Sequence, residues 1–217
     1  MENTVARPPL ADLRIVGGNL ALDFVNTRSG PRDGPVDAEW LSSYEDFAAW
    51  SRRVAGPGPA RPDPAAGPRP AAMDAVAAFA RVVACRDDLD EIFRPLADGR
   101  APLDTAVRRL QLAYVEALAH GRLAGGPPGY AWTWEPGRDL LAPLWPVVAA
   151  AVELLAASPA RPAIPVKACS ACRFLFIDQS KNGSRRWCSM DDCGKAAKIA
   201  RYLQRRSDAS ALSRPGG

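Results

Sequence analysis

The sequence predicts a mainly α-helical protein: a helical N-terminal domain with a minor β-hairpin, followed by a small C-terminal zinc finger of treble-clef-like form. Two observations support this prediction. Apolar residues recur at intervals of three or four over most of the first 160 residues, and four of the five cysteines fall in one short stretch near the C-terminus. We therefore expect a helical domain over residues 1–160, a cysteine module over 165–206 and a flexible tail over 207–217.

The run "IVGGNLALDFVNT", residues 15–27, opens the helical domain. Two glycines interrupt the chain, and Asn19 can then cap a short helix, although a strand is an alternative for the same run. Two polar residues, Asp23 and Asn26, stand inside this apolar stretch. They either satisfy local backbone groups or form a pair that faces a ligand.

Three longer helices are expected next. The first spans 44–54 and is capped by Ser42 or Ser43, the second spans 71–96, and the third has Pro102 in its first turn. Between the first two lies a segment over 56–70 with six prolines and three glycines, which predicts a loop or an extended linker.

A β-hairpin and a further helix complete the expected domain. Alternating aromatic residues over 130–134 predict a strand that pairs with 122–124 across a Gly-Pro turn. Residues 140–157 are the most apolar window, but Glu153 and two prolines favour a buried helix over a membrane span. Residues 158–165 then separate this domain from the cysteines.

The first sixteen residues lack the uninterrupted apolar core and the cleavage site of a secretory signal. We therefore expect a cytoplasmic protein that does not associate with a membrane. In that compartment disulfides are disfavoured, and clustered cysteines more often bind metal.

The cysteine spacing is Cys169-x2-Cys172-x15-Cys188-x4-Cys193, which suits one tetrahedral zinc ion held by four thiolates. Disulfides and a catalytic dithiol are the alternatives, but a dithiol would leave the second cysteine pair unexplained. Catalytic zinc commonly needs an open coordination position and often histidine, whereas the single histidine, His120, is distant in the sequence. We therefore predict structural zinc.

Around these cysteines we expect two strands, 173–178 and 184–188, joined by a turn, and then a helix capped by Ser189. A module of this size has a small core, so metal binding, worth on the order of 10 kcal/mol in finger peptides, should drive its folding. The expected core residues are Phe174, Phe176, Trp187, Ile199 and Leu203.

Positive charge is concentrated in the same module. Residues 167–206 carry ten Lys or Arg and three Asp, so they have a net charge of +7 within a chain of net charge +4. On a helical wheel, Ile199 and Leu203 lie opposite Arg201 and Arg205, which predicts a packed face and a cationic face. Such a surface suits phosphate contacts, although a solvated charged face is the alternative. The candidate nucleic-acid contacts are Lys181, Arg185, Arg186, Lys195, Lys198, Arg201 and Arg205.

The four cysteines within "CSACRFLFIDQSKNGSRRWCSMDDCGKAAK" resemble the CGNR zinc-finger family, and "GGNLALDFVNT" resembles the start of the ABATE domain, the usual upstream partner of that finger. The resemblance implies a regulator of transcription, with the finger contacting DNA and the helical domain sensing a ligand. The family's Cys-Gly-Asn-Arg motif is altered here, because Lys195 and Ala196 replace the Asn and the Arg. Any contact that the family's arginine makes is therefore absent.

Three functions follow as hypotheses. The first is a DNA-binding transcriptional regulator whose helical domain senses a small-molecule effector or forms a homodimer. The second is a zinc-stabilised module that binds an acidic protein. The third, an enzyme with Asp23 and Asn26 in its active site, lacks a nucleophile–base pair or a phosphate-binding loop, so we expect no catalysis.

Overall fold

The computed structural model describes residues 5–54, 72–127, 129–135, 139–156 and 166–212. The expected loop over 56–70 and the separator over 158–165 lie outside these residues. The described elements are, in order, the 3-10 helix η1 (Leu10–Asp12), α1 (Leu20–Val25), β1 (Arg28–Ser29), β2 (Ala38–Glu39), α2 (Tyr44–Val54), α3 (Ala72–Ala97), α4 (Asp104–His120), β3 (Arg122–Gly126), β4 (Gly129–Thr133), α5 (Trp145–Leu155), β5 (Val166–Ala168), β6 (Leu175–Ile177), the π-helical turn η2 (Met190–Gly194) and α6 (Lys195–Leu212).

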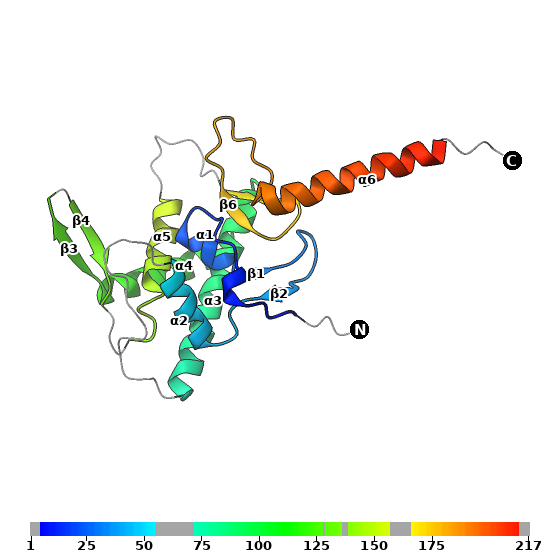
Figure 1. The fold of residues 1–217 in the computed structure, drawn as a ribbon. Coiled ribbons are helices and arrows are strands. Elements are labelled where there is room, and N and C mark those ends of the chain that lie inside the picture. The colour runs from blue at the N-terminus through cyan, green and yellow to red at the C-terminus, as the bar shows by residue number, and fades with distance from the viewer. Residues whose placement is uncertain (1–4, 55–71, 128, 136–138, 157–165, 213–217) are drawn as a thin grey trace.

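The short helix α1 lies at the centre of the helical part, where it contacts both α3 and α5 (Figure 1). Five of its six residues are buried, which explains why this stretch is almost uniformly apolar. The predicted cap is confirmed, because the side chain of Asn19 accepts a hydrogen bond of 2.8 Å from the backbone N–H of Ala21.

Helix α2 begins with a side-chain cap, as the sequence predicts, and Ser43 is the residue that provides it. The hydroxyl of Ser43 accepts a hydrogen bond of 3.2 Å from the backbone N–H of Asp46. In return, the Asp46 carboxylate accepts one of 2.9 Å from the backbone N–H of Ser42. These bonds satisfy donors at the helix start and fix the boundary of α2.

Two predicted helix starts are wrong by a few residues. The helix expected over 140–157 begins at Trp145, with Pro146 in its first turn, because proline lacks the N–H that a later turn requires. Residues 140–144 form turns instead, and Asp139 accepts a hydrogen bond of 2.8 Å from the N–H of Leu141. Helix α4 begins at Asp104, so Pro102 precedes its first turn.

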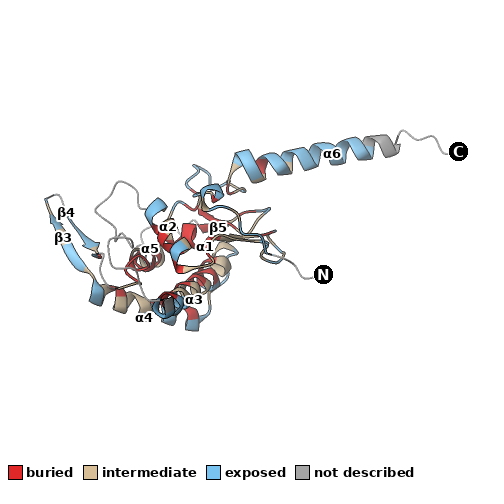
Figure 2. Cartoon of the chain, turned by 60° about the horizontal axis from the view of Figure 1, so that its bottom comes forward, coloured by how far each residue is buried: buried red, intermediate tan, exposed pale blue. Residues whose placement is uncertain are grey.

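The hairpin of β3 and β4 is confirmed, and its strands pair in antiparallel register with Arg122 opposite Thr133. It extends from the body of the protein and is largely exposed (Figure 2). The strand pair in the cysteine module differs from the prediction. There, β5 pairs with β6, with Val166 opposite Ile177, and residues 184–188 form no strand.

This second hairpin turns at the first cysteine pair, not at the polar segment 179–183. Cys169 donates a backbone hydrogen bond of 2.9 Å to the carbonyl of Phe174, which continues the ladder into the turn. The segment after β6 is shaped by the Asp178 carboxylate, which accepts bonds from the backbone N–H groups of Ser180, at 2.9 Å, and Arg185, at 3.0 Å. These bonds use the N–H groups locally, so the segment is not available as a strand.

The helical part and the cysteine module share one hydrophobic core, contrary to the expectation of a separate small core. Phe174, Leu175 and Phe176 are buried in the same cluster as residues of α1 and α3. The join is also polar, because the Asn26 side chain exchanges two hydrogen bonds, each of 2.8 Å, with the backbone of Leu175. The two parts therefore form one packed body.

Helix α6 projects away from this body (Figures 1 and 2). Ile199 is 50% exposed and Leu203 is 58% exposed, so the prediction that this face packs is wrong. The reason is that, among the described residues, the main contacts of α6 are with the turn η2 at its own start. The helix continues past Arg206, where we expected a flexible tail to begin, and ends at Leu212.

Within the described residues, no helix is both long enough and apolar enough to cross a bilayer.

Candidate zinc centre and basic surface

Four cysteine side chains converge beside the β5–β6 hairpin. Cys169 and Cys172 lie on the turn between the two strands, and the turn is tied to the later segment by a bond of 3.0 Å from the N–H of Ser170 to the carbonyl of Arg186. That segment carries Cys188. The hairpin turn thus positions Cys169 and Cys172, and the bond from Ser170 holds the segment with Cys188 next to them.

Cys193 is placed by the π-helical turn η2. The N–H of Gly194 donates a bond of 3.0 Å to the carbonyl of Ser189, five residues earlier. Gly194 allows close packing here, because a Cβ on it would lie 3.0 Å from the sulfur of Met190 and 3.2 Å from the ring of Trp187, and a neighbour would have to shift by a few tenths of an ångström. Ser189 occupies the N-cap position, but its side chain makes no capping bond, so that part of the prediction is wrong.

The positions of the four sulfur atoms fit one zinc ion. All four lie within 4.8 Å of one another, with Cys172 and Cys188 at 3.6 Å and Cys188 and Cys193 at 3.7 Å. Tetrahedral Zn–S bonds of about 2.3 Å require sulfur atoms about 3.8 Å apart. A disulfide would bring two sulfurs to about 2.0 Å, and none of the five cysteines forms one.

Proximity also affects the acidity of these thiols. The pKa of Cys169 is lowered, because the thiols of Cys172 and Cys188 donate hydrogen bonds to its sulfur. Those same bonds raise the pKa of Cys172 and of Cys188, and zinc would have to displace the protons of both thiols, since it binds thiolate sulfur. Four thiolates complete the tetrahedral shell, and the site therefore holds one structural zinc ion.

An arginine from the N-terminal part completes the surroundings of the zinc site. The Arg14 guanidinium donates to the Cys188 sulfur at 3.9 Å and to the Asp192 carboxylate at 2.6 Å. It also lies over the ring of Phe174, 5.3 Å from the centroid. Four thiolates and one Zn²⁺ carry a net charge of about −2, so a fixed cation beside them is stabilising. Sequence analysis missed Arg14, since nothing local connects it with a cysteine 174 positions away.

Arg185, one of the candidate nucleic-acid contacts, has a structural role in the zinc module. Its guanidinium lies 4.2 Å from the centre of the Phe176 ring, and it donates to the carbonyls of Trp187, at 3.0 Å, and of Cys188. These contacts hold the segment that carries Cys188. Only a part of this half-buried side chain faces solvent.

Asp178 is a second residue that sequence analysis missed. The ammonium group of Lys167 lies 2.8 Å from its carboxylate, and the hydroxyl of Ser180 donates to it at 2.6 Å. These contacts hold the pKa of Asp178 well below its ordinary value. The ionised carboxylate fixes the turn between β6 and the second cysteine pair.

The remaining basic candidates are all on the surface. Two lie on the segment before the second cysteine pair, and four lie on α6, where no ion pair is found for them among the described residues. These exposed residues are Lys181, Arg186, Lys195, Lys198, Arg201 and Arg205. Together they form a cationic surface that begins at the zinc centre and continues along the projecting helix.

Asp23 and Asn26 are both buried and both hydrogen-bonded to backbone. The Asp23 carboxylate accepts a bond of 2.7 Å from the N–H of Gly17, and Asn26 joins α1 to β6 as described above. Burial raises the pKa of Asp23 to about 6, and the Gly17 bond opposes this shift. These contacts give both residues a structural role, and the alternative of a ligand-facing pair gains no support from them.

This fold and this site define a zinc-finger protein in which a helical domain and a four-cysteine module share one core. Comparison with protein families extends this description. Residues 18–158 match the ABATE family, which is described as "Putative stress-induced transcription regulator", and residues 166–206 match the CGNR zinc finger. The chain therefore belongs to the ABATE family and carries a CGNR zinc finger, as the sequence resemblance predicts. Neither family is an enzyme family, and comparison with curated proteins finds no match.

Proposed function

We propose that this protein is a DNA-binding regulator of transcription, in which zinc fixes the base of α6 and α6 contacts DNA. The observation that carries the proposal is the exposed cationic face of α6, formed by Lys198, Arg201 and Arg205. These side chains recur at helical spacing, so they lie along one side. A helix of 18 residues is about 27 Å long, and the major groove of B-DNA admits a single α-helix.

Charge next to α6 supports the same proposal. Lys181 and Arg186 are exposed on the segment that leads into the second cysteine pair. This arrangement suits phosphate contacts beside a groove-bound helix, since most protein–DNA hydrogen bonds go to the backbone. With Lys195 and Ala196 in place of the family's Asn and Arg, we expect sequence-independent phosphate contacts to supply most of the affinity.

The test is fluorescence anisotropy with a random-sequence duplex over a series of salt concentrations. Each phosphate contact adds about 0.9 to the slope of log affinity against log salt, so Lys198→Glu/Arg205→Glu should reduce the slope by about 2. The control is Arg52→Glu/Arg108→Glu, which changes the net charge equally on α2 and α4. No binding by the native protein even at low salt would refute the proposal.

A protein-interaction module is the second candidate, and the exposed apolar side of α6 favours it. Ile199, Tyr202 and Leu203 are each at least half exposed, a pattern that suits a protein partner. The cations on the same helix indicate an acidic partner. Ile199→Gln/Leu203→Gln separates the candidates, because it should leave duplex binding unchanged and should abolish an interaction that uses the apolar side.

The helical domain receives a signal or pairs two subunits in this proposal. Both roles extend what the family description says, and the first role requires a site for a ligand.

A further inference from the structure

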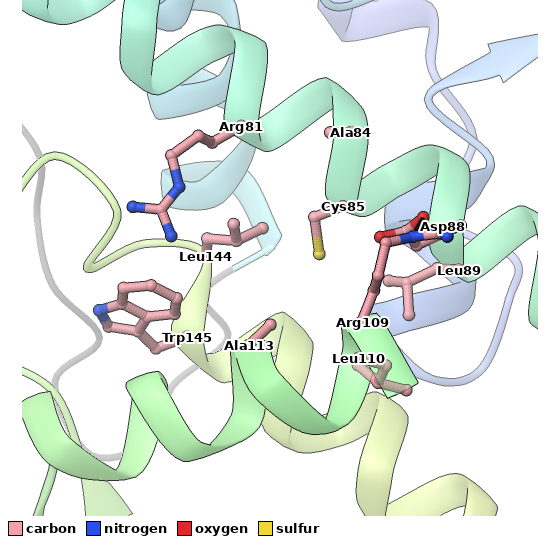
Figure 3. A pocket seen from close by; sticks show the side chains of 10 residues that line it. All are labelled: Arg81, Ala84, Cys85, Asp88, Leu89, Arg109, Leu110, Ala113, Leu144 and Trp145. Carbon is pink, nitrogen blue, oxygen red and sulfur yellow. Dashed lines mark hydrogen bonds and ion pairs between the residues drawn. The ribbon is translucent and has the colours of Figure 1, made fainter. Parts of the chain in front are cut away.

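A partly enclosed hollow lies between α3 and α4, next to the start of α5, on the helical part of the protein. Its volume is about 150 Å³. Figure 3 shows the sulfur of Cys85 and the guanidinium of Arg81 directed from α3 into this space, with Ala113 of α4 and the ring of Trp145 across from them. The residues of the zinc centre do not contribute to it.

The interior of the hollow is mainly apolar. Leu89, Leu110, Leu144 and Trp145 line it and are buried. An engineered apolar cavity of about 150 Å³ in another protein stays free of water and binds benzene. A single six-membered aromatic ring is therefore the largest apolar group that we expect this hollow to accept, and the Trp145 ring offers it an aromatic wall.

The thiol of Cys85 contributes an apolar surface rather than a reactive group. Its pKa is raised to about 12, mainly by burial and to a smaller extent by the nearby Asp88 carboxylate. At neutral pH the group is the protonated thiol, which is a weak nucleophile and a poor metal ligand.

The two ends of the hollow differ in charge. At one end, Arg109 binds the Asp88 carboxylate at 2.7 Å and Glu91 at 2.8 Å, so its charge is neutralised. At the other end, the ion pair found for Arg81 among the described residues is one of 2.6 Å with Glu116, and the two side chains are 54% and 38% exposed. A guanidinium has five N–H donors and exposed ion pairs are weak, so Arg81 can bind a further anion.

We propose that this hollow is a binding site for a small aromatic carboxylate, whose ring packs between Cys85, Ala113 and Trp145 and whose carboxylate pairs with Arg81. This hollow would be the ligand-binding site that a sensing role of the helical domain requires. Only its regulatory meaning rests on the proposed function, since binding is measured without nucleic acid.

The test is calorimetric titration of the full-length zinc protein with benzoate and, as an uncharged match, benzamide. Benzoate should bind more tightly than benzamide. Arg81→Gln should weaken benzoate binding about three- to fivefold and leave benzamide binding unchanged, because it removes a charge-assisted pair at a half-exposed guanidinium and retains the hollow. Arg108→Gln, on the exposed side of α4, is the matched control and should bind both probes as the native protein does.

A second pair of variants tests the hollow itself. Ala113→Leu should abolish binding of both probes by filling the space, and Ala84→Leu, on the exposed side of α3, repeats the test where Ala113→Leu fails to fold. Absence of benzoate binding to the native protein would overturn the proposal. Unchanged binding in a folded leucine variant, or in Arg81→Gln, would overturn it equally. None of these results depends on whether α6 binds DNA.

Discussion

At the scale of single residues, the zinc centre depends on a side chain that is remote in the sequence. Arg14 donates to the sulfur of Cys188, and its charge opposes the negative charge of four thiolates around Zn²⁺. Groups that hydrogen-bond to metal ligands commonly change metal affinity 10- to 100-fold when they are removed. Arg14 is therefore part of the zinc site, although it belongs to the N-terminal segment.

We expect Arg14→Met to lower zinc affinity about 10- to 100-fold, measured by competition with a chelator of known affinity. Methionine keeps most of the packing over Phe174 and removes the N–H donors. Arg7→Met, an exposed residue of the same segment, should leave the affinity unchanged. Equal zinc affinities of the native protein and the two variants would show that Arg14 contributes only packing between the N-terminal segment and the zinc module.

Asp23 should make stability depend on pH. Burial raises its folded-state pKa from 3.8 to about 6, so the folded state prefers the protonated carboxyl. The contribution of the protonated Asp23 carboxyl to the free energy of unfolding is therefore fully present below about pH 4 and is lost as the pH rises through about 6. A shift of about two pKa units corresponds to about 3 kcal/mol.

The variant Asp23→Asn stays uncharged and keeps an oxygen that can accept the Gly17 N–H. Relative to the native protein, its free energy of unfolding should rise by up to about 3 kcal/mol between pH 4 and pH 8. Urea unfolding at the two pH values gives this difference, in which the pH dependence of the shared zinc site cancels. A difference that does not change with pH would contradict the assigned pKa.

At the scale of elements, α6 is a helix whose two faces are both open to solvent. We expect Ile199→Gln/Leu203→Gln to change the free energy of unfolding by less than about 0.5 kcal/mol, as surface substitutions do. Leu175→Ala, at a fully buried position in β6, should cost about 2–5 kcal/mol. Chemical denaturation of the native protein and the two variants measures these changes in the free energy of unfolding. A large loss in the α6 variant would mean that this face packs against something in solution.

The elements that sequence alone predicts are those with local causes. Asn19 and Ser43 act within their own helix turns, the aromatic alternation at 130–134 gives β4, and cysteine spacing gives the metal ligands. The failures have causes that the local pattern of residue types does not contain. An apolar stripe at Ile199 and Leu203 looks the same whether or not a partner element exists. The pairing of β5 with β6, and the positions of Arg14 and Arg185 at the zinc centre, depend on the assembled fold.

At the scale of the whole molecule, the helical domain and the zinc module share one hydrophobic core. Phe174, Leu175 and Phe176 lie in the same core as Phe24 of α1 and Phe93 of α3. The Asn26–Leu175 bonds and a bond of 3.0 Å from Arg32 to the carbonyl of Cys169 join the same parts through buried or half-buried polar groups. A change at the zinc site should therefore alter the packing of the helices. This coupling would give a physical route between a ligand bound to the helical part and α6.

Removal of zinc should consequently destabilise the whole protein and not the finger alone. In Cys188→Ser, which lacks one thiolate ligand, we expect the zinc content to fall well below one per chain and the single unfolding transition to move to a lower temperature. Amide hydrogen exchange should rise in α3 as well as in β6, because the two elements pack together. Cys85→Ala removes the cysteine outside the cluster and should keep one zinc per chain. If Cys188→Ser leaves exchange in α3 unchanged while β6 loses protection, the two parts fold independently, and the shared core transmits nothing between the zinc site and the helices.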